Sequence, residues 1–367
     1  MSRWVVLFCL AGCSFSPPTL TPDVDALLDV PPEGAPGAPT DLVAMPRDHE
    51  LAVTWTAPDP GTSAIQSYAA TAVPDDPGLP VRSCISATPS CTMIGVVNGV
   101  TYTINVTATN AAGTGAPSGQ ARAMPIPNVL GDPQVQLWLD AAAPETLTTT
   151  SGAVAAWSDR SPRSRSAAQA TAEQQPLYEP TGVAGHAAIT FDGVDDGLVS
   201  IGFVAGDTSY TIFTAGANRD AAVPITNYVS VLYASMNCGS GSPGFAAYAY
   251  SSFLTPNDVR IPNVESGNAA SNSVRIDGSP AVAIPNNTNS THPNVIVPAG
   301  QWLLVTQQVR TTGNPGGSEL FLGRYRNGCQ HGKVSLGELV VFDRVLSTAE
   351  IAAVEDYLSH KWRVALR

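Results

Sequence analysis

The fold of this chain is decided by residues 333–362, which read KVSLGELVVFDRVLSTAEIAAVEDYLSHKW. Residues 334–342 alternate between apolar and polar side chains and then become continuously apolar, which predicts a strand buried on one or both faces. Ser347 stands three residues before Glu350, the spacing of a capping box, so a helix is predicted to begin there.

This helix is predicted to be amphipathic. Apolar side chains recur near a 3.6-residue period and form one stripe, at Ile351, Val354, Leu358 and Trp362. The polar side chains between them are expected mainly on the solvent face, at Glu355, Asp356, Ser359 and Lys361. Since an apolar stripe must be covered, we expect the helix to dock on the preceding sheet.

Composition favours an all-β chain. Its 367 residues suffice for about two domains. Only 13% of the residues are charged, whereas Gly (32) and Pro (31) are abundant, which favours many short strands joined by turns. The formal net charge is −12 and lysine occurs only at Lys333 and Lys361, so we expect no nucleic-acid partner.

The N-terminal residues have the pattern of an export signal. Arg3 supplies a positive charge, and residues 4–10 form an apolar run too short to span a bilayer. Residues 10–13, Leu-Ala-Gly-Cys, resemble the bacterial lipobox. The resemblance implies cleavage before Cys13, a lipid anchor on Cys13 and, from Ser14, an outer-membrane location; an ordinary secretory signal is the alternative. Residues 1–12 are interpreted as a signal peptide and the proline-rich residues 13–36 as a tether.

Four cysteines follow the signal, Cys84, Cys91, Cys238 and Cys329, an even number in a chain expected to be exported. Three disulfide connectivities are open, and pairing within each domain, Cys84 with Cys91 and Cys238 with Cys329, is the simplest. No C-x-x-C pair occurs and the histidines are scattered singly, which disfavours a zinc-type site.

Residues 37–124 are predicted to form a small sandwich, because Leu51, Val53 and Trp55 alternate with Ala and Thr, and residues 101–110 alternate likewise. The segments PGAPTDLVA, LAVTW and NGVTYTINVTATNAAGTGAPS resemble a fibronectin type III domain. The resemblance implies that Tyr102 is the corner tyrosine of that family and that the domain is a spacer or weak binder. Trp55 and Tyr102 are expected in the core rather than on a ligand platform.

Residues 125–133, PIPNVLGDP, are predicted to be a linker, and residues 134–367 a second domain. Strands are predicted at residues 135–139, 187–191, 210–215, 228–234, 245–250, 273–276, 281–284, 302–309, 319–325 and 334–342. Many short strands with one late helix predict a jelly roll of two stacked sheets.

The segments VQLWLDAAAPETL, HAAITFDGVDDGL and residues 337–362 resemble laminin G-like members of the concanavalin A-like lectin/glucanase superfamily. The fold class is therefore all-β: a fibronectin type III sandwich followed by a concanavalin A-like jelly roll with one C-terminal helix. The resemblance implies that residues 334–342 form the closing edge of the jelly roll, beside residues 135–139.

Glucanases of that superfamily carry two glutamates four residues apart on one strand, with an aspartate between them. Here Glu338 has no such partner, because Val340, Val341 and Phe342 follow it. Glu338 is interpreted as a rim or structural residue and no catalytic residue is assigned; the sequence leans against enzymatic activity without excluding it.

A binding site is expected on the Gly- and Asn-rich loops of the second domain. If Cys238 is joined to Cys329, residues 233–250 meet residues 324–327. The candidate ligand-binding residues are Tyr233, Asn237, Tyr248, Tyr250, Asn287, Arg324, Tyr325 and Asn327. Because Tyr248 and Tyr250 share one strand face, burial in the core is the competing interpretation.

No cofactor is assigned with certainty, and the metal is unknown. Ca2+ is a candidate. Asp192, Asp195 and Asp196 match a turn of the superfamily and are read as structural, with calcium as the lesser alternative.

These features predict an exported, outer-membrane-anchored, non-catalytic binding or adhesion protein. Its expected partners are the membrane, through Cys13, and an extracellular glycan or another surface protein. A polysaccharide-acting hydrolase or lyase with an unrecognised site is one alternative, and a structural envelope component is another.

Overall fold

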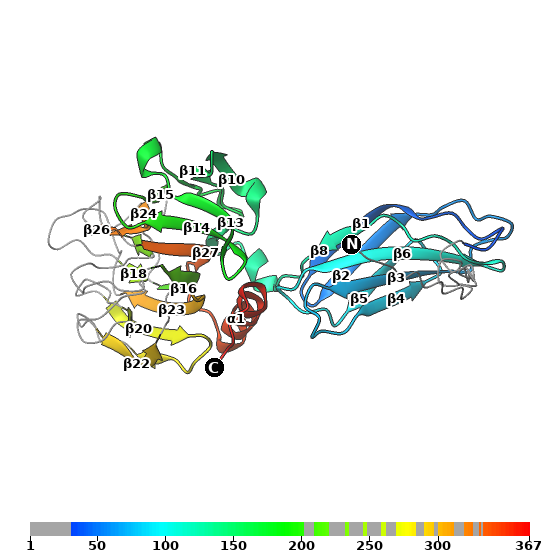
Figure 1. Ribbon diagram of the computed structural model, residues 1–367. Helices are drawn as coiled ribbons and strands as arrows, with labels where there is room; N and C mark the ends of the chain where they lie inside the picture. Colours follow the sequence, from blue (N-terminus) through cyan, green and yellow to red (C-terminus); the bar gives the residue numbers. More distant parts are fainter. Residues whose placement is uncertain are drawn as a thin grey trace, which may run out of the picture.

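The chain folds into two β-rich bodies joined by a short connection (Figure 1). We call residues 37–124 the N-terminal sandwich and residues 134–367 the large domain. The computed structural model describes residues 31–201, 209–219, 232–234, 245–247, 258–261, 269–283, 290–296, 300–311, 319–325, 330–331 and 333–367. The predicted signal peptide, Cys13 and most of the predicted tether lie outside these ranges.

The strands of the N-terminal sandwich are β1 (Thr40–Arg47), β2 (Glu50–Thr56), β3 (Ser67–Pro74), β4 (Arg82–Ser86), β5 (Ser90–Ile94), β6 (Tyr102–Asn110), β7 (Gly113–Thr114) and β8 (Ala121–Ala123). One sheet has the order β1-β2-β5 and the other β4-β3-β6-β7, with β8 also paired to β6. Trp55 and Tyr102 are buried in the core between the sheets, as the sequence predicts. The Tyr102 hydroxyl accepts a hydrogen bond from the Val97 amide at 3.0 Å.

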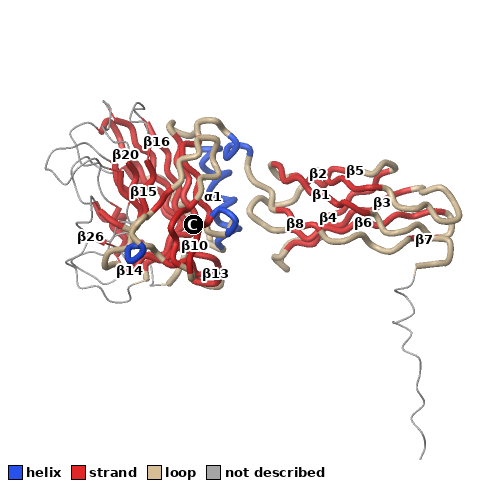
Figure 2. The backbone as a smooth tube through the Cα atoms, turned by 90° about the horizontal axis from the view of Figure 1, so that it is seen from above, coloured by secondary structure: helices blue, strands red, loops and turns tan. Residues whose placement is uncertain are grey.

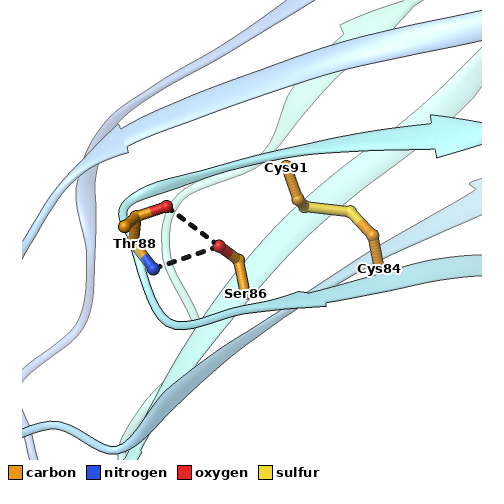
Figure 3. Close-up of a disulfide and its surroundings, with 4 residues drawn as sticks. All are labelled: Cys84, Ser86, Thr88 and Cys91. Atoms are coloured by element: carbon orange, nitrogen blue, oxygen red, sulfur yellow. Dashed lines mark hydrogen bonds between the residues drawn. A yellow bond between two sulfur atoms is a disulfide. The ribbon is translucent and has the colours of Figure 1, made fainter.

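A disulfide joins Cys84 on β4 to Cys91 on β5, with their Cα atoms 6.2 Å apart (Figure 3). Because β4 and β5 belong to different sheets, the bond links the two layers of the sandwich. In the adjoining turn the Thr88 amide donates to the Ser86 hydroxyl at 3.0 Å. The predicted pairing of Cys84 with Cys91 is confirmed, whereas Cys238 and Cys329 lie outside the described residues.

Removing this disulfide should destabilise the N-terminal sandwich. We expect the double variant C84A/C91A to lose about 2.5 kcal/mol of unfolding free energy, because the short loop is no longer closed in the unfolded state. Hydrogen exchange of the β6 amides, followed by mass spectrometry, measures this loss. Unchanged β6 protection in the double variant would contradict the expectation.

The large domain contains many more strands and the helix α1. They are β9 (Val135–Asp140), β10 (Leu147–Thr150), β11 (Ala153–Trp157), β12 (Ala167–Ala168), β13 (Leu177–Val183), β14 (His186–Asp192), β15 (Leu198–Ile201), β16 (Ser209–Asn218), β17 (Leu232–Ala234), β18 (Phe245–Ala247), β19 (Asp258–Ile261), β20 (Ala269–Ile276), β21 (Val282–Ala283), β22 (Ser290–Ile296), β23 (Leu303–Thr311), β24 (Glu319–Leu322), β25 (Arg324–Tyr325), β26 (Gln330–His331), β27 (Lys333–Phe342) and α1 (Thr348–Trp362). Short 3-10 helices, η2 (Asn128–Gly131), η3 (Pro144–Thr146) and η4 (Ala172–Gln174), lie in the connections.

Most of these strands belong to one large, curled sheet, while β19–β22 and β25–β26 form separate pairs. The predicted fold class is confirmed: the described residues are nearly all β, with α1 at the C-terminal end. Each strand of this sheet is hydrogen-bonded to the next without a break, so the layers that face each other across the core belong to one continuous sheet.

β27 lies in the middle of this sheet and not at its edge, which corrects the sequence expectation. On one side it pairs with β16 and on the other with β14 (Figure 1). Further along, the β14 side of β27 pairs with β9. Residues 334–342 are all buried. A strand that is covered on both faces carries a continuous apolar run, which explains its composition.

The predicted capping box of α1 is confirmed. The Ser347 hydroxyl accepts from the Glu350 amide at 3.3 Å, and the Glu350 carboxylate accepts from the Ser347 amide at 2.8 Å. Arg344 adds a hydrogen bond to Glu350 at 2.7 Å. The predicted apolar stripe is buried as expected, at Ile351, Val354, Leu358 and Trp362.

The predicted solvent face is wrong for Glu355 and Lys361, which are both buried. The Glu355 carboxylate accepts from the Arg275 guanidinium at 2.9 Å and from the Thr306 hydroxyl at 2.7 Å. Glu355 and Lys361 thus bond to side chains on the sheet below the helix, so that their charges are paired inside the domain.

The start of α1 should make stability depend on pH. Hydrogen bonds from Arg344, and then from the Ser347 amide, lower the pKa of Glu350 from 4.5 to about 2. Because the folded-state pKa is depressed, this stabilisation is present above about pH 4.5 and lost as the pH falls toward 2. We expect the melting temperature of E350Q to fall less than that of the unmodified protein across this window. Parallel melting curves would contradict the assignment.

Among the residues that the structure describes, none of the helices combines the length and the hydropathy that crossing a membrane requires.

Candidate functional site

Three charged side chains meet between the sheet and α1, and we call them the buried carboxylate cluster: Asp140 on β9, Glu338 on β27 and Lys361 on α1. The strand register places Asp140 directly opposite Glu338. The Lys361 ammonium lies 2.7 Å from Asp140 Oδ2 and 2.8 Å from Glu338 Oε2. Arg160 also pairs with Asp140, and its guanidinium lies 4.2 Å from the Trp138 ring centre. Two carboxylates are therefore balanced by two cations.

The Glu338 carboxylate has no exposed surface, and each of its oxygens accepts two hydrogen bonds. Oε1 accepts from the Trp138 indole at 2.7 Å and from the Tyr357 hydroxyl at 3.0 Å. Oε2 accepts from the Trp362 indole at 2.8 Å and from Lys361. A carboxylate offers about four lone-pair sites, so none is left for a substrate. Glu338 lies in the interior, not at a rim, and serves the fold.

Electrostatics agrees with a structural role. Burial raises the pKa of Glu338, and the Lys361 ammonium opposes this rise. Burial, followed by the charges of Glu338 and Asp140, raises the pKa of Tyr357 well above 10. At neutral pH the phenol therefore remains protonated and donates to Glu338. The cluster fastens α1 to the central strand.

Sequence reasoning places residues 135–139 beside β27 and misses Asp140, one residue further along β9. No local signal marks it, since its partner Glu338 is far away in the chain. The order of the two segments in the curled sheet is what brings the carboxylates together.

A cleft of about 400 Å³ lies between the two domains, next to the cluster. The sandwich contributes Asp75, Asp76, Gly99, Val100 and Thr101, and the large domain contributes Asp140, Arg160, His186, His360, Lys361 and Arg363 among others. Burial, and then the nearby Arg363, lower the pKa of His186. Asp140 and Lys361 border the cleft, but they are bonded to each other and nearly buried.

The predicted ligand-binding residues fall largely where the structure describes nothing: Asn237, Tyr248, Tyr250, Asn287 and Asn327 lie outside the described residues. For Tyr233 on β17, and for Arg324 and Tyr325 on β25, the backbone alone is described.

The backbones of these two strands lie close together. β17 pairs with β24, with Tyr233 opposite Phe321, and β24 continues through Gly323 into β25. β17 also contacts β25 directly. Cys238 and Cys329 lie outside the described residues, so their disulfide and the ligand site stay predictions.

The carboxylates of Asp192, Asp195 and Asp196 lie within 4.8 Å of one another. Asp192 Oδ1 accepts from the Val194 amide at 2.7 Å, and Asp196 Oδ2 accepts from the Asp192 amide at 2.8 Å. These bonds close the turn between β14 and β15, which agrees with the structural interpretation. Calcium binding here stays a prediction.

Comparison with known proteins identifies the first domain. Residues 37–123 match the family model of the fibronectin type III domain. Human protein sidekick-1 is 34% identical over 114 residues, which cover 29% of this chain and 5% of the human protein. Mouse protein sidekick-1 is 36% identical over 95 residues, covering 24% and 4%. The chain thus spans a small fraction of the length of these relatives.

Solved structures give similar matches. The FN5 domain of Drosophila Lar is 23% identical, covers 25% of this chain and 97% of its own, and has a TM-score of 0.22. A structure described as a myokine is 18% identical, covers 25% and 99%, and has a TM-score of 0.22. Residues 37–123 are a fibronectin type III domain, a module that suggests a non-catalytic role in binding or adhesion.

Proposed function

We propose that this chain is an exported, lipid-anchored surface protein that binds a glycan or another surface macromolecule without chemical turnover. The observation that carries the proposal is the fibronectin type III domain at residues 37–123, a module that suggests binding or adhesion. In this proposal the domain is the spacer, and the loops of the large domain, with Tyr233, Arg324 and Tyr325, supply the recognition surface.

The geometry of the large domain supports a laminin G-like origin. Its curled sheet and the pairing of β27 with β9 agree with that resemblance, which places residues 334–342 beside residues 135–139. A glucanase of this fold needs carboxylates that face the substrate. Glu338 is enclosed and saturated with hydrogen bonds, which favours binding over hydrolysis.

The position at which the chain enters the sandwich is compatible with a lipid anchor on Cys13. The first described residues lie at the end of the sandwich that carries β7, away from the large domain, since the Pro32 side chain would lie 2.8 Å from a Cβ at Gly113 on β7 (Figure 2). Lipids on Cys13 would then hold the large domain one domain length or more from the membrane. Mass spectrometry of the membrane-extracted protein tests this, with C13A as the control: an unmodified Cys13 contradicts the anchor.

A glycan array probed with residues 14–367, with and without EDTA, tests the binding proposal. We expect at least one glycan class to be retained and no sugar to be released. Loss of binding in EDTA would assign Ca2+ a role. Release of sugar would instead favour the hydrolase or lyase alternative. If the protein neither binds a glycan nor releases sugar, the result favours a structural component.

For a retained glycan, R324A and Y325A should each weaken binding about tenfold if these side chains are anchors of the site. R310A is the matched control, because Arg310 is an exposed arginine on β23. If R324A, Y325A and R310A bind the glycan with equal affinity, the recognition surface does not include Arg324 and Tyr325.

A further inference from the structure

The N-terminal sandwich touches the large domain at the last turns of α1, which faces the sandwich (Figure 1). Gly99 has a φ of +80°, and a Cβ at this position would lie 2.1 Å from the Tyr357 carbonyl oxygen and 3.1 Å from the Lys361 amide nitrogen. Both atoms belong to the backbone of the helix and have little room to move. Glycine is therefore the residue that permits this approach.

Buried hydrogen bonds hold the loop that carries Gly99. Asn98 is almost fully buried, and its amide group donates to Asp48 at 2.8 Å while accepting from the His49 amide at 3.0 Å. The Gly99 amide donates to the Pro125 carbonyl at 2.9 Å. The loop with Asp48 and His49 is thus bonded to the loop with Asn98 and Gly99. The second loop is also bonded to Pro125, the first residue after the sandwich.

The connection between the domains is also fixed along its length. The Asp48 carboxylate accepts from the Asn128 amide at 3.3 Å. Leu130 is 2% exposed and packs in the core of the large domain, with Ile126 and Val129 partly buried beside it. At the far end, Asp132 accepts from Arg344 at 2.7 Å. The predicted linker is therefore bonded to both domains.

We propose that the fibronectin type III domain is a rigid arm, locked on the large domain by the contact of Gly99 with α1. Tyr357 and Lys361 present backbone atoms to Gly99 and side chains to Glu338, so the lock rests on the same helical turn as the buried carboxylate cluster. The arm fixes the direction in which the large domain is held relative to residues 31–36, where the described chain enters the sandwich. The lock does not depend on the ligand.

The variant G99A tests the lock, and G95A is its matched control. Gly95 also has a positive φ, +73°, but a Cβ there would meet its nearest atom, in the Arg82 side chain, at 3.8 Å. Both variants strain the backbone alike, and G99A alone collides with the helix. Small-angle X-ray scattering on residues 31–367 reports the spread of domain orientations, and limited thermolysin digestion reports access to residues 125–132.

We expect G95A to match the unmodified protein in both measurements. G99A should broaden the distance distribution and be cleaved in the connection about tenfold faster, since native-state cleavage follows the population of the open form. Circular dichroism verifies that each variant is folded. The proposal is overturned if G99A and G95A behave alike, or if the unmodified protein already samples many orientations.

A second variant keeps the test decisive if G99A does not fold. D48A removes the acceptor of the Asn128 amide and of the Asn98 side chain, and the carboxylate is partly exposed. We expect faster cleavage of the connection in D48A as well. An unchanged cleavage rate in folded D48A would equally overturn the lock.

Discussion

Replacing Lys361 with methionine should lower the unfolding free energy of the large domain by about 3–5 kcal/mol. The side chain is 5% exposed and is bonded to two carboxylates that are themselves buried. Without the ammonium, Asp140 keeps Arg160, but Glu338 retains no cation and must be protonated or remain charged inside the domain. This is the largest single-residue effect that we expect.

Urea unfolding of K361M, followed by hydrogen exchange of the β27 amides, measures this loss. R122A is the control, because Arg122 pairs with Asp75 at 2.5 Å on the surface, where both side chains are about half exposed. An exposed pair contributes at most about 1 kcal/mol. Losses of similar size in K361M and R122A would show that the cluster does not hold α1 in place.

Substitution of Gly323 should have the second-largest effect on the unfolding free energy. It has a φ of +73°, and a Cβ there would lie 2.0 Å from the Phe191 ring, which is itself buried on β14. We expect G323A to cost about 2–4 kcal/mol, because left-handed strain adds to overpacking of the core. Gly323 also sets the bend between β24 and β25, the strand that carries Arg324 and Tyr325.

The variant G300A separates the backbone strain from the overpacking of the core in the same urea unfolding measurement. Gly300 has a similar φ of +77°, and nothing lies within 4 Å of a Cβ there. Its loss should be limited to the backbone strain of about 1 kcal/mol. If G323A lost no more than G300A, the ring of Phe191 would not restrict this bend.

Local patterns in the sequence predict much of the fold. The capping box of Ser347 and Glu350 and the apolar stripe of α1 depend on residues within a few turns of one another, and both are confirmed. The N-terminal sandwich follows from alternation around Trp55 and from family motifs that span the whole domain. Cys84 and Cys91 are seven residues apart in the sequence, which makes their pairing the simplest one to predict.

Burial of the charged helix residues depends on partners that the local pattern does not contain. Glu355 lies only about 40° from Ile351 around the helix axis, so its position beside the apolar stripe is a local signal of burial. Its partner Arg275 is on another strand, and nothing local marks it. The fixed connection depends on distant partners too, because PIPNVLGDP has the composition of a free linker and Leu130 is buried by residues far away in the chain.

The variant E338Q tests most directly whether Glu338 serves the fold and not catalysis, when it is assayed for stability and, on a retained glycan, for affinity and sugar release. We expect lower stability, because Lys361 loses a buried partner, together with unchanged affinity of the folded protein and no sugar release by either form. If the unmodified protein released sugar and E338Q, equally stable, did not, Glu338 would act on a substrate and its structural role would be contradicted.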